Sequence, residues 1–340
     1  MGYKITNEKM DEVLTRLKEN YLVYAPKWDR PHKNVRFSQI KSVSEIVTDR
    51  QSDFSIKEVF YPVSQVMFYF KGDNVELAEA NADKEILIFC HACDINSIKR
   101  LDKIFMENRA DLNAECGQCA DLFYARLRDK VHFVLMECGE GFDDCFCVST
   151  SSNVADDYVM AVKFDDGQCL VETKCCVDKA FEGLGEACDY VPGFVTENKK
   201  VLKVPCMSRE NLKDVSEMDY WKQFDEKCIG CGGCNTVCGT CSCFDTVDVI
   251  YSEGSTDGER RRVWSSCMLD SFTETAGGSK SRNSHGANMR FKVFHKFYDF
   301  SQRFGTDFNM CVGCGRCDIR CPQDISFFDV VNGLAKEIEK

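Results

Sequence analysis

The first periodic pattern in the chain lies in residues 8–20, where Met10, Val13, Leu14 and Leu17 alternate with polar side chains. Spacings of three and four place these apolar side chains on one face of a helix. We therefore predict an amphipathic opening helix whose apolar stripe packs against a core.

Short apolar runs of strand length follow this helix. They are rich in β-branched and aromatic residues, which favour strands. These runs occupy residues 21–24, 66–70, 86–89 and 133–136. Helical patterns in residues 95–109 and 119–129 lie between the later runs. Strands that alternate with helices predict an α/β domain.

The pattern changes near residue 205, beyond which helix-length segments separate cysteine-rich loops. The charged stretch 197–200 and the prolines at 192 and 205 indicate a linker before this change. We therefore predict an α+β protein of two domains. An N-terminal α/β domain occupies residues 1–205, and a mainly helical ferredoxin-like domain occupies residues 206–340.

Composition limits the partners of this chain. The longest apolar runs, such as 85–90 and 131–136, are far shorter than the roughly 18 residues of a membrane span. The formal charge of −12 disfavours nucleic acid and anionic membranes. One basic run, residues 258–264, stands out. It predicts either a solvated face or a contact of Arg260, Arg261 and Arg262 with an acidic partner or the surroundings of a metal cluster.

Twenty-three cysteines dominate the composition. The first residues lack the apolar stretch of a secretory signal, so we expect a cytoplasmic protein whose thiols stay reduced. Disulfides then do not explain the cysteines, and metal binding is the remaining explanation for most of them. So many thiolates also favour an anaerobic host, because air oxidises them stepwise.

The strongest motif covers residues 311–322, which match the bacterial ferredoxin pattern C-x2-C-x2-C-x3-C-P at every position. Residues 228–238 repeat the spacing, with Gly239 in place of the proline. In ferredoxins with two clusters, the fourth cysteine of each run binds the cluster of the other run. We therefore predict two [4Fe-4S] clusters, one on Cys228, Cys231, Cys234 and Cys321, and one on Cys311, Cys314, Cys317 and Cys238.

Zinc is the alternative for these motifs, but a tetrahedral zinc ion would leave cysteines of each run unused. About 70 residues separate the two runs, which is too long for a compact ferredoxin. The arrangement resembles the all-helical ferredoxin domain of fumarate reductase iron–sulfur subunits. Three further cysteines lie nearby in the sequence: Cys241, Cys243 and Cys267. Each is expected to be an alternative cluster ligand, a hydrogen-bond partner that tunes the reduction potential of a cluster, or a small apolar packing residue.

The N-terminal domain holds a candidate third site. Its cysteines follow predicted strands, and loops at the carboxyl ends of strands are where α/β proteins place their sites. The four candidate ligands of a third [4Fe-4S] cluster are Cys93, Cys138, Cys145 and Cys147. The alternative is a set of unligated buried thiols. Cys90, Cys116 and Cys119 lie in the same part of the sequence.

Several segments together resemble the iron–sulfur electron-transfer component of anaerobic sulfite reductase. They are residues 92–96, 145–147, 228–243, 260–267, 276–278 and 311–322. The β subunits of cytoplasmic sulfhydrogenases are similar. The resemblance implies a three-subunit enzyme in which a flavoprotein that binds FAD and NADH delivers electrons, this chain relays them, and a sirohaem partner reduces sulfite to sulfide. Gly239 and Lys280 depart from the expected pattern.

No motif for a flavin, a nicotinamide or a substrate is present in this chain. We therefore expect an electron carrier without its own substrate site, as part of a multi-subunit oxidoreductase. The alternatives are the β subunit of a hydrogenase, recognised by a nickel partner instead of sirohaem, and an iron–sulfur regulator. The acidic balance disfavours the regulator, because it would need a nucleic-acid surface.

Overall fold

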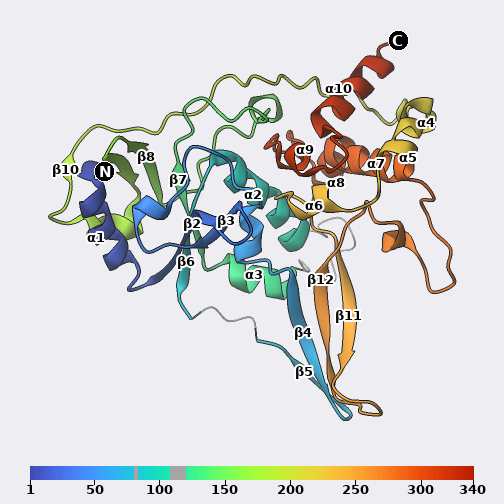
Figure 1. Ribbon diagram of the computed structural model, residues 1–340, viewed down its shortest axis with the longest axis horizontal. Helices are drawn as coiled ribbons and strands as arrows, with labels where there is room; N and C mark the ends of the chain where they lie inside the picture. The colour runs from blue at the N-terminus through green and yellow to red at the C-terminus, as the bar shows by residue number, and fades with distance from the viewer. Residues whose placement is uncertain (80–82, 108–119) are drawn as a thin grey trace.

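The computed structural model describes residues 1–79, 83–107 and 120–340 (Figure 1). Its larger sheet has eight strands in the order β10-β1-β9-β8-β7-β6-β2-β3. The strands are β1 (Gly2–Thr6), β2 (Tyr21–Asp29), β3 (Asn34–Gln39), β6 (Glu85–Cys90), β7 (Val131–Met136), β8 (Met160–Asp165), β9 (Gln168–Thr173) and β10 (Glu186–Ala187). Neighbours among β2, β6, β7 and β8 are parallel, and the outer pairs are antiparallel.

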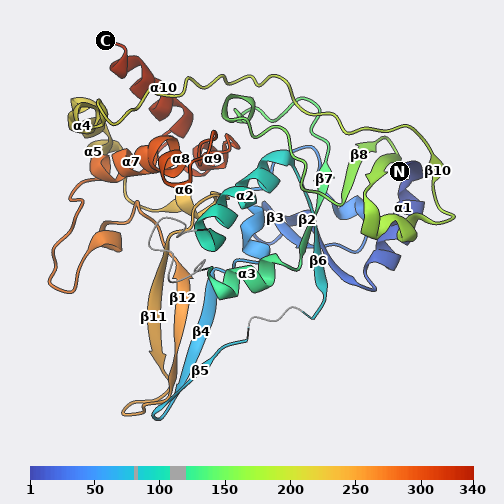
Figure 2. The ribbon, with the colours of Figure 1, turned by 180° about the vertical axis from the view of Figure 1, so that it is seen from behind.

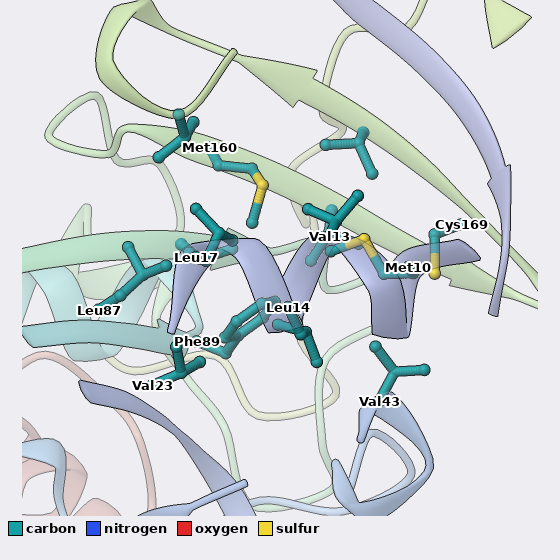
Figure 3. Packing of buried hydrophobic residues seen from close by; sticks show 14 of the residues in the cluster. Met10, Val13, Leu14, Leu17, Val23, Val43, Leu87, Phe89, Met160 and Cys169 are labelled. Carbon is teal, nitrogen blue, oxygen red and sulfur yellow. The ribbon is translucent and has the colours of Figure 1, made fainter. Parts of the chain in front are cut away.

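Helices cover both faces of this sheet. Helix α1 (Asn7–Leu17) buries the predicted stripe against one face, where it meets Leu87 and Phe89 of β6 (Figure 3). Helices α2 (Ala92–Met106) and α3 (Leu122–Arg128) pack on the other face, against Ile86 and Ile88. Alternate residues of β6 therefore enter two different cores, as expected for a parallel strand buried on both sides.

A second sheet has four antiparallel strands in the order β11-β12-β4-β5. They are β4 (Ser64–Lys71), β5 (Asn74–Leu77), β11 (Phe244–Ile250) and β12 (Gly258–Trp264). This sheet extends away from the helices as an arm (Figure 1). It joins strands from both sides of residue 205. The sequence pattern indicated helices rather than the β11–β12 hairpin here, because the charged residues of these strands obscure the alternation of apolar positions.

The C-terminal part is otherwise helical, in agreement with the predicted mixed fold class (Figure 2). Its helices are α4 (Leu212–Glu217), α5 (Gln223–Lys227), α6 (Gly233–Thr236), α7 (His285–Phe294), α8 (Phe300–Phe304), α9 (Arg316–Arg320) and α10 (Phe327–Ile338). A π-helical turn, His295–Asp299, joins α7 to α8. Short 3-10 helices occupy Val43–Glu45, Ile56–Val59, Val148–Thr150, Cys175–Phe181, Asp219–Lys222 and Asp270–Thr273.

The connection from β10 to α4 has no regular secondary structure and runs along one side of the molecule (Figure 1). It contains Pro205 and the charged stretch that the sequence indicated as a linker. No helix within the described ranges is long and apolar enough to cross a membrane.

Candidate iron–sulfur sites

The two ferredoxin motifs fold the backbone in the same way. Gly230 and Gly313 have φ of 64°, and Gly232 and Gly315 have φ of 71° and 75°. These left-handed conformations suit glycine, which has no Cβ. In each motif the second glycine starts a one-turn helix, α6 or α9. In the first motif the turn brings the amide of Gly230 to 3.5 Å from Cys228 Sγ.

We name the first site as the set Cys228, Cys231, Cys234 and Cys321. All four residues line one pocket, together with the apolar side chains of Met268, Met289 and Phe327. Burial raises the pKa of the Cys228 thiol, and the three other thiols of the site raise it further. The structure therefore brings Cys321 of the second motif beside the first motif.

We name the second site as the set Cys238, Cys311, Cys314 and Cys317. Helices α6 and α9 pack against each other, and this carries Cys238 to the second motif. Burial raises the pKa of Cys311 to about 12, and Cys238 contributes in the same direction. Burial is also the largest cause of the raised pKa values of Cys314 and Cys317, and Cys238 raises both further.

Two buried lysines lie among these cysteines. Burial opposes the charged form of Lys292, but Cys234 and Cys317 together raise its pKa above the ordinary value. Lys296 lies one helical turn later, and its Nζ donates to Cys238 Sγ at 3.4 Å and to Thr240 Oγ1 at 2.9 Å. Neither lysine was predicted from the sequence patterns. The signal that could have identified them was a pair of lysines four residues apart in the aromatic-rich stretch 289–300.

The third site is the set Cys93, Cys138, Cys145 and Cys147. Strands β6 and β7 are parallel neighbours, so their carboxyl ends meet at one edge of the sheet. Cys93 lies in the first turn of α2 after β6, and Cys138 lies two residues after β7. Charge interactions link the four thiols: burial raises the pKa of Cys93, and Cys145 and Cys147 raise it further. Burial is the largest cause of the raised pKa values of Cys145 and Cys147, and Cys138 raises both further.

The loop that carries Cys145 and Cys147 packs directly against the second motif. The amide of Phe146 donates to the carbonyl of Gly313 at 2.7 Å. A Cβ on Gly313 would lie 2.5 Å from Phe146 O, so this close approach requires glycine. Cys93 and Cys147 share a buried apolar cluster with Cys314. The third site therefore adjoins the second site.

A buried ion pair also joins these two sites. Arg316, between Cys314 and Cys317, pairs with Asp94 beside Cys93 at 2.8 Å, and both side chains are almost fully buried. Its guanidinium also donates to the backbone carbonyl and to the hydroxyl of Ser52. The cost of burying two charges is offset by this pairing and these hydrogen bonds.

The connection from β10 to α4 covers the third site. Asn198 accepts a hydrogen bond from the amide of Val148 at 2.8 Å and lies 3.6 Å from Cys147 Sγ. Its Nδ2 is buried without a hydrogen-bond partner in the part of the chain that the structure describes. A buried donor beside a candidate ligand fits a bound cluster, because cluster sulfurs accept hydrogen bonds.

The additional cysteines near the second site form close thiol pairs. A hydrogen bond from Cys267 lowers the pKa of Cys243 to about 6. Cys267 in turn accepts from Asn235 Nδ2 at 3.0 Å. Cys241 is buried and forms a hydrogen bond with Cys238. These three residues are therefore hydrogen-bonded to other thiols or amides beside the candidate ligands. Cys116 and Cys119 lie outside the described residues.

The three consecutive arginines each have a partner within the chain. Arg260 forms a bidentate pair with Asp248, with both distances 2.6 Å, and Arg261 pairs with Glu259. Arg262 is buried, pairs with Asp121 and lies 4.8 Å from the ring of Tyr61. The basic run therefore forms strand β12, and the side chain of Arg262 is buried inside the protein rather than solvated.

The donor sets fit iron–sulfur clusters. Each of the three sites has four thiols, the number that a [4Fe-4S] cluster uses. Within the described ranges, no three His, Cys, Asp or Glu side chains are placed to hold a single metal ion. The four cysteines of a [4Fe-4S] cluster need not lie as close together as the ligands of a single metal ion, because each of them binds a different iron atom.

The motifs and their geometry define the class of protein: an iron–sulfur protein with a ferredoxin-type domain. Residues 227–325 match the family described as a 4Fe-4S dicluster domain. Over 347 aligned residues, the chain is 29% identical to sulfhydrogenase 2 subunit beta of Pyrococcus furiosus, and the alignment covers 97% of each chain. The resemblance to sulfhydrogenase β subunits is thereby confirmed. The chain is an iron–sulfur electron-transfer protein similar to that β subunit.

Proposed function

We propose that this chain relays single electrons between two partner proteins through three [4Fe-4S] clusters, one at each of the three sites. The main observation in support is that neighbouring sites contact each other. Lys292 lies between Cys234 of the first site and Cys317 of the second. Cys314 of the second site shares an apolar cluster with Cys93 and Cys147 of the third. Bound clusters would accept and donate electrons one at a time.

This spatial order makes the second site the middle station. Cys314 is buried and Cys317 is only partly exposed, whereas Cys231 of the first site is exposed and its neighbour Ile229 is 55% exposed. The first site is therefore a docking point for one partner. We infer that the third site lies near the surface at the other end of the relay, because Cys138 is partly exposed and the two residues after it are exposed. In this proposal, residues 1–205 hold the third site and residues 206–340 hold the other two.

The proposed electron donor is a flavoprotein that binds FAD and NADH, and the proposed acceptor is a cytoplasmic sirohaem protein that reduces sulfite to sulfide. The support is the resemblance of residues 92–96 and 260–267 to the electron-transfer component of anaerobic sulfite reductase. A second candidate is the β subunit of a hydrogenase. It is supported by the 29% identity to the sulfhydrogenase β subunit of Pyrococcus furiosus.

Anaerobic isolation of the native complex tests the proposal. We expect roughly twelve iron and twelve sulfide atoms for each copy of this chain, counted on the chain after separation from its partners. The absorbance of sirohaem in a co-purified partner supports sulfite reduction, whereas nickel in the partner supports the hydrogenase. A chain that holds zinc and no labile sulfide would contradict the relay in either form.

A further inference from the structure

Lys292 and Lys296 are only 3% exposed, although lysine is among the residues that are least often buried without a partner. They lie one turn apart, where α7 enters the π-helical turn. Turns of this kind are frequent at functional sites. Within the described ranges, no carboxylate forms an ion pair with either ammonium group, and the nearest groups that would carry negative charge with a cluster bound are the surrounding cysteine sulfurs.

The two lysines face different cysteines. Lys292 lines one pocket together with Cys234 of the first site and Cys317 of the second, and its Nζ lies 4.5 Å from the ring centre of Phe327. Lys296 faces Cys238 and Cys311, which both belong to the second site. Of these two lysines, both therefore lie beside the second site, whereas only Lys292 lies beside the first.

Other cations near the second site have partners of their own. Arg316 is paired with Asp94, which neutralises its charge locally. Lys57 donates to the backbone carbonyl of Cys241 at 2.7 Å and lies over the ring of Trp264. Lys296 is different, because its ammonium group contacts the sulfur of a candidate ligand directly.

Such a charge affects the reduction of a nearby cluster. Reduction adds one electron, and no proton, to a group that is already anionic because of its four thiolates. A fixed cation stabilises the added negative charge and so raises the reduction potential. Inside a protein a unit charge a few ångströms away changes such an equilibrium by about tenfold or more.

We propose that Lys292 and Lys296 order the potentials of the relay: Lys296 raises the potential of the cluster at the second site, and Lys292 raises the potentials at the first and second sites together. This inference rests on the proposed function, because it requires clusters at both sites. Its consequence is that the middle station holds an electron more tightly than the first site does.

A redox titration of the full-length protein, followed by electron paramagnetic resonance, tests this inference. In Lys296→Met, the midpoint potential of the second cluster is expected to fall while that of the first stays unchanged. At a fixed potential the ratio of reduced to oxidised second cluster should drop about tenfold, which equals about 59 mV for one electron. In Lys292→Met, both midpoints are expected to fall. The signal of the second cluster is identified as the one that disappears in Cys314→Ser.

Three further variants separate charge from structure. Lys296→Arg keeps the charge and should retain the higher potential, whereas Lys296→Gln keeps a donor without the charge and should lower it. If Met at position 296 prevents cluster insertion, the Gln and Arg pair decides the question. Lys71→Met removes a 59% exposed lysine at the tip of the arm and should change neither midpoint.

The outcomes distinguish the two proposals. Unchanged midpoints in Lys296→Met or Lys296→Gln, with full iron content, would overturn the role of the lysines and leave the relay intact. A wild-type protein without labile sulfide would overturn the relay itself, whatever the lysine variants do.

Discussion

Glycines shape the backbone around the candidate ligands. Gly230, Gly232, Gly313 and Gly315 adopt positive φ, which turns the chain tightly between successive cysteines. Isolated cysteines lack this context. Cys169, for example, is fully buried in the core beneath α1, where it packs as a small apolar side chain (Figure 3). The residues around a thiol therefore separate a candidate ligand from a packing residue.

Cys314→Ser is expected to remove the second cluster and to abolish nearly all electron transfer to the terminal acceptor, because a serial relay fails when its middle station is lost. Iron should fall by roughly four atoms per chain. The measurements are iron content and turnover with the physiological donor. Cys206→Ser, which changes an exposed cysteine, is the control and should keep full iron and turnover. Normal iron in Cys314→Ser would show that the ligand assignment is wrong.

The β11–β12 hairpin links the cysteine-rich part of the chain to the N-terminal part. Strand β12 pairs along β4, so the arm connects segments almost 200 residues apart in sequence. Within this element the neighbouring arginines alternate in environment. Arg260 points to solvent beside Asp248, whereas Arg262 is buried with Asp121 and Gln65. Charge alone does not distinguish them in the sequence.

Arg262→Met is expected to destabilise the protein by about 3 kcal/mol, because it leaves the carboxylate of Asp121 without its buried partner. Arg260→Gln removes an exposed pair and should have a much smaller effect. Urea unfolding of the two anaerobically purified variants compares them. Equal unfolding midpoints would show that the buried pair does not stabilise the arm. Replacing all three arginines together would mix this loss of stability with any effect on partner binding.

In the proposed relay, the second site lies between the other two, at the junction between the two parts of the molecule. Helix α2, which begins at the third site, lies beside α6 of the first motif (Figures 1 and 2). The Arg316–Asp94 pair and the Phe146–Gly313 hydrogen bond hold the junction together. In the proposed relay, the N-terminal sheet supports the third site.

The double variant Cys145→Ser, Cys147→Ser is expected to lower iron from roughly twelve to roughly eight atoms per chain, because only the third cluster is lost. Electron transfer between the two partners should nearly stop, while the signals of the other two clusters persist. The full chain is the right material, since a fragment ending at residue 205 would lose Arg316 and the strand partner of β4. If iron and transfer are unchanged, the four thiols are packing residues.

The local pattern of apolar and polar residues predicted several of the helices and strands. The spacing of Met10, Val13, Leu14 and Leu17 predicted α1, and the short apolar runs predicted β2, β4, β6 and β7. These features depend on neighbours in sequence, because periodicity determines which face of an element is apolar. The ferredoxin spacing likewise predicted [4Fe-4S] clusters, and residues 227–325 match the 4Fe-4S dicluster domain family.

Only the tertiary structure decided the features that depend on distant contacts. The hairpin partner of β4, the pairing of Arg316 with Asp94 and the contact of Phe146 with Gly313 each join residues more than 150 positions apart. The burial of Lys292 and Lys296 among cysteines is of the same kind. A sequence shows which groups are charged, but their surroundings depend on which distant elements pack against them, and those surroundings determine their energies.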